Sequence, residues 1–213
     1  PACDFKVLLT SKTGAEGITY TPTSSSQPKR FIAFNSETCL ENLTITYTKS
    51  SLSCIKANGH KLVIGAGVTC VGTAGSYLNL IGGTYEGDEK AQSTELIIRS
   101  GHWRNIYAGS FNNDALGDVK LIMTNATADS SVVPGRAGET GGNVTMHFEN
   151  VTIGGGIYGG NSSKNNVLGN VTITLGENVS AASGVWAGSS IEGNVEGTVT
   201  MIAAGADLAA LAI

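Results

Sequence analysis

The stretch GNVTITL at residues 169–175 nearly repeats GGNVTMHF at residues 141–148. Two related stretches are DVKLIM at 118–123 and TVTMIA at 198–203, so a nearly constant spacing separates the first valines of the four copies, Val119, Val144, Val171 and Val199. A recurrence of about 20–50 residues is typical of a solenoid or another repeat array. The sequence therefore predicts a stack of similar units over its second half.

Apolar and polar residues alternate within each copy, which is the two-residue period of a β-strand with one buried side. The residue before each valine and the residue after it are polar, whereas the valine side is apolar throughout. The pattern predicts that the side chains on the valine side are buried and that the intervening threonines face outward. The predicted buried residues are Val144, Phe148, Val171, Ile173 and Leu175, and the outward residues are Thr145, Thr172 and Thr174.

A second recurrent phrase reads IYAGS at 106–110, IYGGN at 157–161 and VWAGS at 185–189. Turn residues, many of them glycine, separate it from the strand stretches, and no segment has helical periodicity. Two or three short strands per unit with glycine at the corners describe one coil of a β-solenoid, because a tight corner leaves no room for a Cβ beneath the next coil. We predict an all-β, right-handed parallel β-helix with coils of about 16–28 residues.

The first half contains short apolar runs of the same kind with a less regular spacing, such as FKVLLTS, HKLVIGAGV and TELIIRSGHW. Strands of one kind flank the loop-like patch TPTSSSQPKR at 21–30, so it is interpreted as a surface excursion and not as a domain linker. We predict one domain over residues 1–213, with irregular coils and all four cysteines in 1–93 and regular glycine-rich coils in 94–213.

The phrases NGHKLVIGAGV, GNVTITL and GIYGGN resemble the right-handed parallel β-helices of the pectate-lyase-like superfamily. They are most similar to the glycine-rich repeats of bacterial cell-surface proteins of the adhesin-like and autotransporter-like kinds. At the level of pattern the resemblance covers residues 35–203. It implies the fold much more strongly than an activity, because many β-solenoids share such phrasing and have unrelated functions.

Composition excludes two classes of partner. The net charge is −4 and the 13 lysines and arginines form no run or stripe, so the charge pattern of a nucleic-acid-binding protein is missing. No apolar run reaches the length of about 18 residues that a membrane-spanning helix needs. Only 14% of the residues are charged, which predicts a surface of Thr, Ser, Asn and Gly and favours glycans or surface proteins as partners.

Four cysteines lie in the first third of the chain, and none of them belongs to a CxxC motif or to a zinc-ligand spacing. Cys3, Cys39, Cys54 and Cys70 predict two disulfides and an extracellular or cell-surface location, and four buried thiols are the alternative. The nearly even spacing of Cys39, Cys54 and Cys70, close to the local repeat, suggests that two of them are stacked neighbours.

Seven Asn-x-Ser/Thr sequons are candidate glycosylation sites: Asn42, Asn125, Asn143, Asn150, Asn161, Asn170 and Asn178. The alternative is that a repeated Asn-Val-Thr strand produces sequons automatically. Both interpretations predict a polar outer face.

The richest polar stretch is IIRSGHWRNIYAGSFNNDALGDVK at 97–120. It offers Trp103 as an aromatic platform for a sugar, with Arg104, Asn112 and Asp114 as hydrogen-bonding partners. An ordinary corner with a solvated loop is the alternative interpretation. No cofactor is predicted; calcium is the one ion for which the turn EGDEK at 86–90 offers carboxylates, and a solvated acidic turn is the alternative there.

The sequence thus favours a non-catalytic structural or adhesive β-solenoid module of an extracellular or cell-surface protein. The alternative is a carbohydrate-active enzyme or carbohydrate-binding module that uses the surface from Trp103 to Lys120. A broken array of outward threonines makes an ice-binding face less favoured. The apolar ending TVTMIAAGADLAALAI predicts that the last coil is covered by another segment, which would allow end-to-end assembly of copies into filaments.

Overall fold

The computed structural model describes residues 7–10, 17–20, 31–47, 54–72, 77–163, 165–189 and 192–206. The described residues form twenty β-strands and no helix. All strand pairs among them are parallel. The described residues accordingly contain no helix that is long and apolar enough to cross a bilayer.

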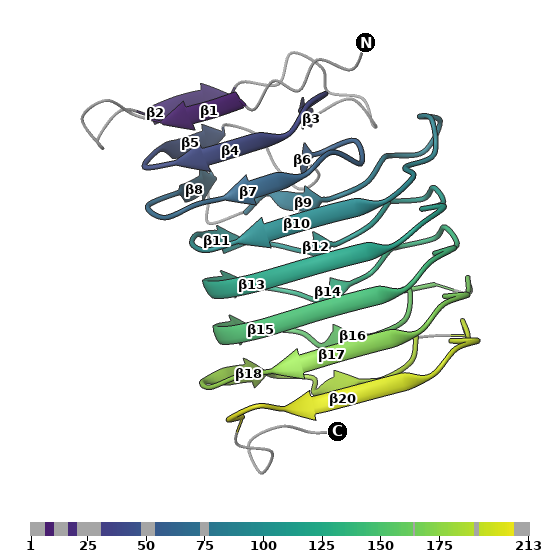
Figure 1. Ribbon diagram of the computed structural model, residues 1–213. Coiled ribbons are helices and arrows are strands. Elements are labelled where there is room, and N and C mark those ends of the chain that lie inside the picture. Colours follow the sequence, from purple (N-terminus) through teal and green to yellow (C-terminus); the bar gives the residue numbers. More distant parts are fainter. Residues whose placement is uncertain are drawn as a thin grey trace.

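Three parallel sheets form the walls of the stack (Figure 1). Sheet A runs through β1 (Val7–Thr10), β4 (Thr38–Glu41), β7 (Leu62–Ile64), β10 (Thr94–Ile98), β13 (Val119–Ala128), β15 (Val144–Ile153), β17 (Val171–Leu175) and β20 (Val199–Ala203), and β11 (His102–Trp103) and β18 (Val179–Ala181) extend it beside β13 and β15. Sheet B contains β2 (Gly17–Tyr20), β5 (Thr44–Tyr47) and β8 (Thr69–Gly72). Sheet C contains β3 (Phe31–Ala33), β6 (Cys54–Lys56), β9 (Asn79–Ile81), β12 (Ile106–Tyr107), β14 (Val132–Val133), β16 (Ile157–Tyr158) and β19 (Val185–Trp186).

The chain is a parallel β-solenoid, as predicted, but its coils are longer than expected in the first half. One line of register partners crosses sheet A through Val7, Thr38, Leu62, Leu96, Leu121, Met146, Ile173 and Met201. The steps from Val7 to Thr38 and from Leu62 to Leu96 exceed the predicted upper limit of about 28 residues. These coils are long because each visits more than one sheet before it returns to sheet A.

The predicted inner and outer sides of the repeated strands are confirmed. Val144, Phe148, Val171, Ile173 and Leu175 are at most 1% exposed, and they belong to one continuous apolar core. The intervening threonines Thr145, Thr172 and Thr174 lie on the outer face of sheet A. In-register parallel pairing places each buried side chain directly on its equivalent in the next coil.

Asparagines in the left-handed backbone region bend the strands of sheet A. Asn125 and Asn150 have φ angles of 50° and 52° within β13 and β15, and Asn178 has a φ of 53° just before β18. Asparagine tolerates this conformation better than other residues with a side chain. The side chain of Asn178 donates to Oδ1 of Asn150 at 2.8 Å, so the bends of adjacent coils are joined.

Several sequon asparagines therefore have a structural role. Oδ1 of Asn143 accepts the backbone N–H of Asn170 at 2.9 Å, and Oδ1 of Asn170 accepts that of Thr198 at 2.9 Å. Six of the seven sequon asparagines are exposed, whereas Asn161 is fully buried and its Nδ2 donates to the carbonyl of Gly138 at 2.9 Å. The prediction that Asn161 carries a glycan is therefore wrong for the native fold, because its amide nitrogen is enclosed. Glycosylation of the other six asparagines stays a prediction.

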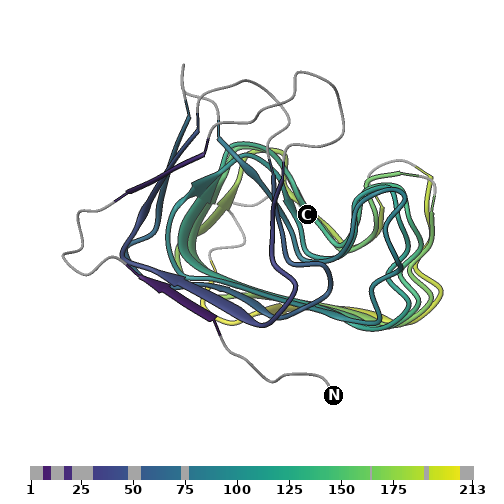
Figure 2. The same cartoon turned by 90° about the horizontal axis from the view of Figure 1, so that it is seen from above.

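An arm projects from the side of the coils from β9 onward, and it is seen at the right of Figure 2. Its described residues are 82–93, 108–118, 134–143, 159–163, 165–170, 187–189 and 192–198, which lie between the strands of sheet C and the next strands of sheet A. Parallel bridges join Ala91 to Ala115, Ala115 to Thr140, Thr140 to Val167 and Val167 to Val195. The arm is therefore a lateral extension of the same stack.

The two predicted disulfides are contradicted. Cys39, Cys54 and Cys70 are thiols, and Cys3 lies outside the described residues. If all four cysteines formed two bridges, one bridge would contain Cys3 and the other would join two of these three residues. They lie in β4, β6 and β8, on three different sheets, because the interval between successive cysteines is shorter than one coil.

The thiols of Cys54 and Cys70 are expected to resist alkylation in the native protein. Burial raises the pKa of each to about 11, so almost no thiolate is present at pH 8. Iodoacetamide treatment followed by peptide mapping should label both cysteines only after denaturation. Rapid labelling of either residue in the folded protein, or a bridge between them, would contradict this arrangement.

The last described strand differs from its predecessors in exposure. In β20, Val199 is 36% exposed and Ile202 is 44% exposed, whereas Val171 in the preceding coil is buried. The apolar stretch LAALAI at 208–213, which was predicted to need a cover, lies outside the described residues. Coverage of this end by another segment or another copy stays a prediction.

Candidate functional site

The structure removes Trp103 from the predicted sugar site. Trp103 lies in β11, is 0% exposed and belongs to the central core. Its Nε1 donates to the carbonyl of Ser100 at 3.1 Å. The prediction that Trp103 is an aromatic platform for a sugar was wrong, because neither face of its ring is accessible to a ligand.

The other three predicted residues occupy two separate places. Arg104 is exposed between β11 and β12, whereas Asn112 and Asp114 lie on the arm. Asn112, at a φ of 53°, donates to Glu86 of the preceding coil at 3.3 Å. The structure thus brings Asn112 close to Asp114 in the arm but does not bring either of them together with Trp103.

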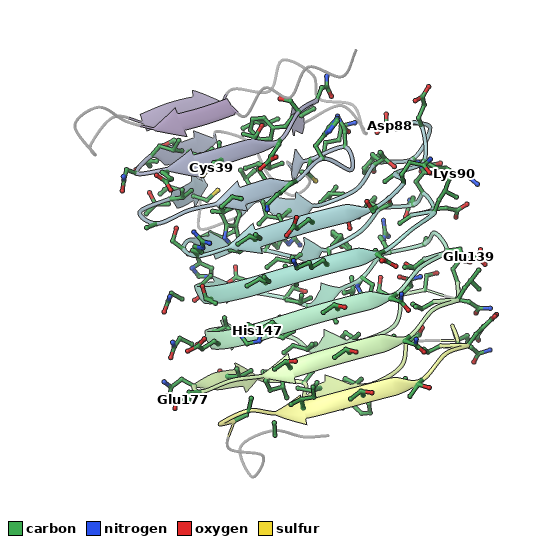
Figure 3. The ribbon with its side chains drawn as sticks, in the orientation of Figure 1. Cys39, Asp88, Lys90, Glu139, His147 and Glu177 are labelled. Atoms are coloured by element: carbon green, nitrogen blue, oxygen red, sulfur yellow. The ribbon has the colours of Figure 1, made fainter. Side chains whose placement is uncertain are left out.

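Asp114 joins three layers of the arm (Figure 3 labels its two partners, Lys90 and Glu139). Its carboxylate lies 2.6 Å from Nζ of Lys90 and accepts the backbone N–H of Glu139 at 2.9 Å. The hydrogen bond from Lys90, and then the one from the Glu139 backbone, hold the pKa of Asp114 below its usual value. Asp114 is therefore an ionised inter-coil link.

Two of the carboxylates in the acidic turn at 86–90, those of Glu86 and Asp88, bind other groups of the protein. Asp88 lies 2.6 Å from Nζ of Lys56, which is only 9% exposed, and accepts the backbone N–H of Tyr85 at 3.0 Å. Glu86 accepts from Asn112. Among the described residues, no three His, Cys, Asp or Glu side chains form a group that could hold a metal ion.

A row of aromatic side chains lies on the outer face of sheet C. In β12, β16 and β19 the first residue, Ile106, Ile157 or Val185, is buried in the core. The second residue therefore points outward, because successive side chains of a strand face opposite sides. Tyr107, Tyr158 and Trp186 are these outward residues, and we call them the aromatic row.

The exposed part of the row lies in the last two of these strands. Tyr158 and Trp186 are direct register partners, and neighbouring parallel strands are about 4.8 Å apart. Tyr158 is half-buried and Trp186 is 49% exposed. The indole Nε1 of Trp186 donates to the carbonyl of Ser183 at 2.9 Å, which fixes the orientation of the ring.

Side chains of the arm pack against Tyr107 in a small second cluster, in which Phe111 is buried and Tyr85 and Tyr107 are partly buried. The rings of Tyr85 and Phe111 are stacked with centroids 4.8 Å apart, and Tyr107 meets Phe111 edge to face at 4.9 Å. The guanidinium of Arg136 lies 4.6 Å from the centroid of Phe111. Burial raises the pKa of Tyr107 and of Tyr85, and the charge of Arg136 opposes both shifts.

Two open hollows are also present. One of about 550 Å³ lies beside the first layer of the arm; of its charged groups, Lys56 is paired with Asp88 and Lys90 with Asp114. The other, of about 480 Å³, contains Cys70, Tyr77 and His102. The Tyr77 ring stacks on His102 at 3.6 Å, and the raised pKa of Cys70 makes this thiol a poor nucleophile at neutral pH.

The sequence contained the signal for the aromatic row. The phrases IYAGS, IYGGN and VWAGS repeat an aliphatic residue followed by an aromatic one. Each phrase predicts a short strand of the coil, but the outward direction of its aromatic residue is not part of that prediction. The arm residues Tyr85 and Phe111 share no such phrase, so only the folded stack reveals that they are neighbours.

Comparison of the chain with protein-family models, with curated proteins and with solved structures gives no match.

Proposed function

We propose that the chain is a non-catalytic module of an extracellular or cell-surface protein, and that it binds glycans through the aromatic row. The observation that carries this proposal is the register pair of Tyr158 and Trp186, whose rings are accessible on the outer face of sheet C. The solenoid acts as a rigid support that holds these rings at a fixed spacing. An adhesive role requires such a support and no reacting group.

Aromatic rings suit saccharides for a physical reason. A sugar ring has apolar C–H faces that pack on an aromatic face, while its hydroxyl groups stay hydrated or bond to polar neighbours. The fixed indole of Trp186 loses little conformational freedom on binding, which lowers the entropic cost of association. A row of rings on successive coils can contact successive units of a linear glycan.

The alternative, a polysaccharide-cleaving enzyme on the surface from Trp103 to Lys120, has weaker support. Glycosidic bond cleavage usually needs a carboxylic acid with a raised pKa beside a second carboxylate. Asp114 has a lowered pKa instead, and Oδ1 of Asp118 accepts the backbone N–H of Asn143 at 2.8 Å. These carboxylates therefore link coils, and the proposed module binds without cleaving.

Replacing Trp186 with alanine, and separately Tyr158 with alanine, should weaken glycan binding about two- to tenfold each. The reason is that one aromatic stacking contact contributes about 0.5–1.5 kcal/mol and about 1.4 kcal/mol corresponds to a factor of ten. The measurement is binding of the intact chain to an oligosaccharide panel, followed by titration calorimetry with the best ligand.

Leu168→Ala is the matched control, because Leu168 is an exposed apolar side chain of the arm outside the aromatic row. It should bind like the parent. Glycan binding that is unchanged in both aromatic variants, or ligand cleavage by the parent that is abolished in Asp114→Ala, would contradict the proposed function.

A further inference from the structure

The stacking of three coils holds Arg136 against the ring of Phe111. Tyr85 and Phe111 are parallel bridge partners, and the backbone N–H of Arg136 donates to Ser110 at 3.1 Å, beside Phe111. Tyr85, Phe111 and Arg136 therefore occupy equivalent positions in successive layers of the arm. Phe111 lies between the Tyr85 ring and the guanidinium, at 4.8 Å and 4.6 Å from its centroid.

Among the described residues, no carboxylate neutralises the positive charge of Arg136. The four lysines in the described part of the chain, Lys56, Lys61, Lys90 and Lys120, each lie within salt-bridge distance of an Asp or Glu. For Arg136 the described residues provide the Phe111 ring and no carboxylate within that distance. A cation–π contact positions a guanidinium but leaves its N–H donors available to an anion.

Arg136 also stands beside an interruption of the aromatic row. Between Tyr107 and Tyr158 the equivalent outward position is Val133, which is only 1% exposed. Arg136 follows Val133 closely in the same coil and is exposed. The guanidinium lies over the ring of Phe111, which meets Tyr107 edge to face, so Arg136 is close to this part of the row.

We propose that Arg136 is the anion-binding group of the glycan site, so that the module selects saccharides that carry a carboxylate or sulfate group. This inference rests on the proposed function. The acidic group of the ligand bonds to Arg136 at the Val133 coil, while its sugar rings pack on Tyr107 and Tyr158 on either side. A planar guanidinium can hold either acid through two parallel hydrogen bonds.

The selectivity has to be local, because the chain as a whole carries a charge of −4 and repels acidic ligands at long range. Binding of an acidic saccharide should therefore depend on one residue and weaken with added salt. Arg99 offers a matched control, because it is an exposed arginine that follows β10 on sheet A, away from sheet C and the arm.

The test compares three ligands of equal length: a neutral oligosaccharide, its carboxylated form and its sulfated form. Each is titrated against the parent and against Arg136→Gln, Arg136→Lys and Arg99→Gln. Arg136→Gln should weaken binding of at least one acidic ligand by about 10- to 100-fold, since hydrogen bonds to charged groups are the strong ones. Binding of the neutral ligand should be unchanged, Arg136→Lys should recover part of the loss, and Arg99→Gln should behave like the parent.

Different failures have different meanings. If the parent binds neutral and acidic ligands equally and Arg136→Gln changes neither affinity, Arg136 is not an anion site although the glycan module stands. An equal loss in Arg99→Gln and Arg136→Gln also overturns the inference, because it shows a diffuse charge effect. If no ligand binds the parent, the proposed function itself fails. Unchanged circular dichroism and melting temperature of Arg136→Gln verify that the variant is folded.

Discussion

Trp103→Ala is expected to lower the free energy of unfolding by about 3–5 kcal/mol, which is the range for removing a large aromatic side chain from a well-packed core. Trp103 is 0% exposed and pairs in register with Ala128 of the next coil. Its ring also packs directly over Gly101, which has a φ of 96°. Alanine at this position would leave a cavity that neighbouring coils cannot close without breaking their parallel pairing.

The loss should appear as a lower urea midpoint in unfolding followed by circular dichroism. Trp186→Ala removes the same side chain from a 49% exposed position and serves as the matched control. We expect it to change the stability by less than about 1 kcal/mol, in the usual range for surface positions. Equal destabilisation by the two changes would show that Trp103 is not in the core.

Gly138→Ala is expected to destabilise the protein by about 3 kcal/mol, the upper part of the usual range for overpacking. Gly138 lies in the arm, and a Cβ at this position would overlap the backbone carbonyl of Asn113 in the preceding layer. A backbone group of a hydrogen-bonded stack cannot move aside as a flexible side chain can. The two layers would have to separate, and the bond from buried Asn161 to the Gly138 carbonyl would be strained.

Thermal melting and limited proteolysis of the arm would measure this effect. Gly188→Ala is the control, because Gly188 lies in another layer of the arm and a Cβ there meets nothing within 4 Å. It should change stability by no more than about 0.5 kcal/mol. If both variants melt like the parent, the layers of the arm are not in the close contact described here.

The repeat and its inner side could be predicted because both are local properties. Val144 and Val171 occur in nearly identical phrases, and their two-residue alternation specifies which side chains are buried without knowledge of any distant contact. The position of Trp103 could not be predicted in this way. The stretch GHWRN looks like a corner, and only its pairing with Thr127 and Ala128 places His102 outside and Trp103 inside.

The disulfide prediction was wrong for a related reason. Their even spacing matched an assumed short coil, but the coil that leaves sheet A in β4 returns to it only in β7, after β5 and β6 have been formed on the other two sheets. Cys39, Cys54 and Cys70 therefore occupy three walls. Asn161 is similar, because its sequon Asn-Ser-Ser carries no local signal of burial, yet the asparagine lies in the arm and is buried there.

The sequence alone thus determined that the chain is an all-β parallel solenoid and which side of each repeated strand faces the core, since period and alternation depend on neighbouring residues only. The tertiary structure decided the number of walls, the arm and the candidate site. Tyr107 lies on sheet C, Phe111 lies on the arm of the same coil, and Arg136 lies on the arm of the next coil. They meet because the arm packs beside sheet C and its layers stack, and a repeat pattern in the sequence does not specify these contacts.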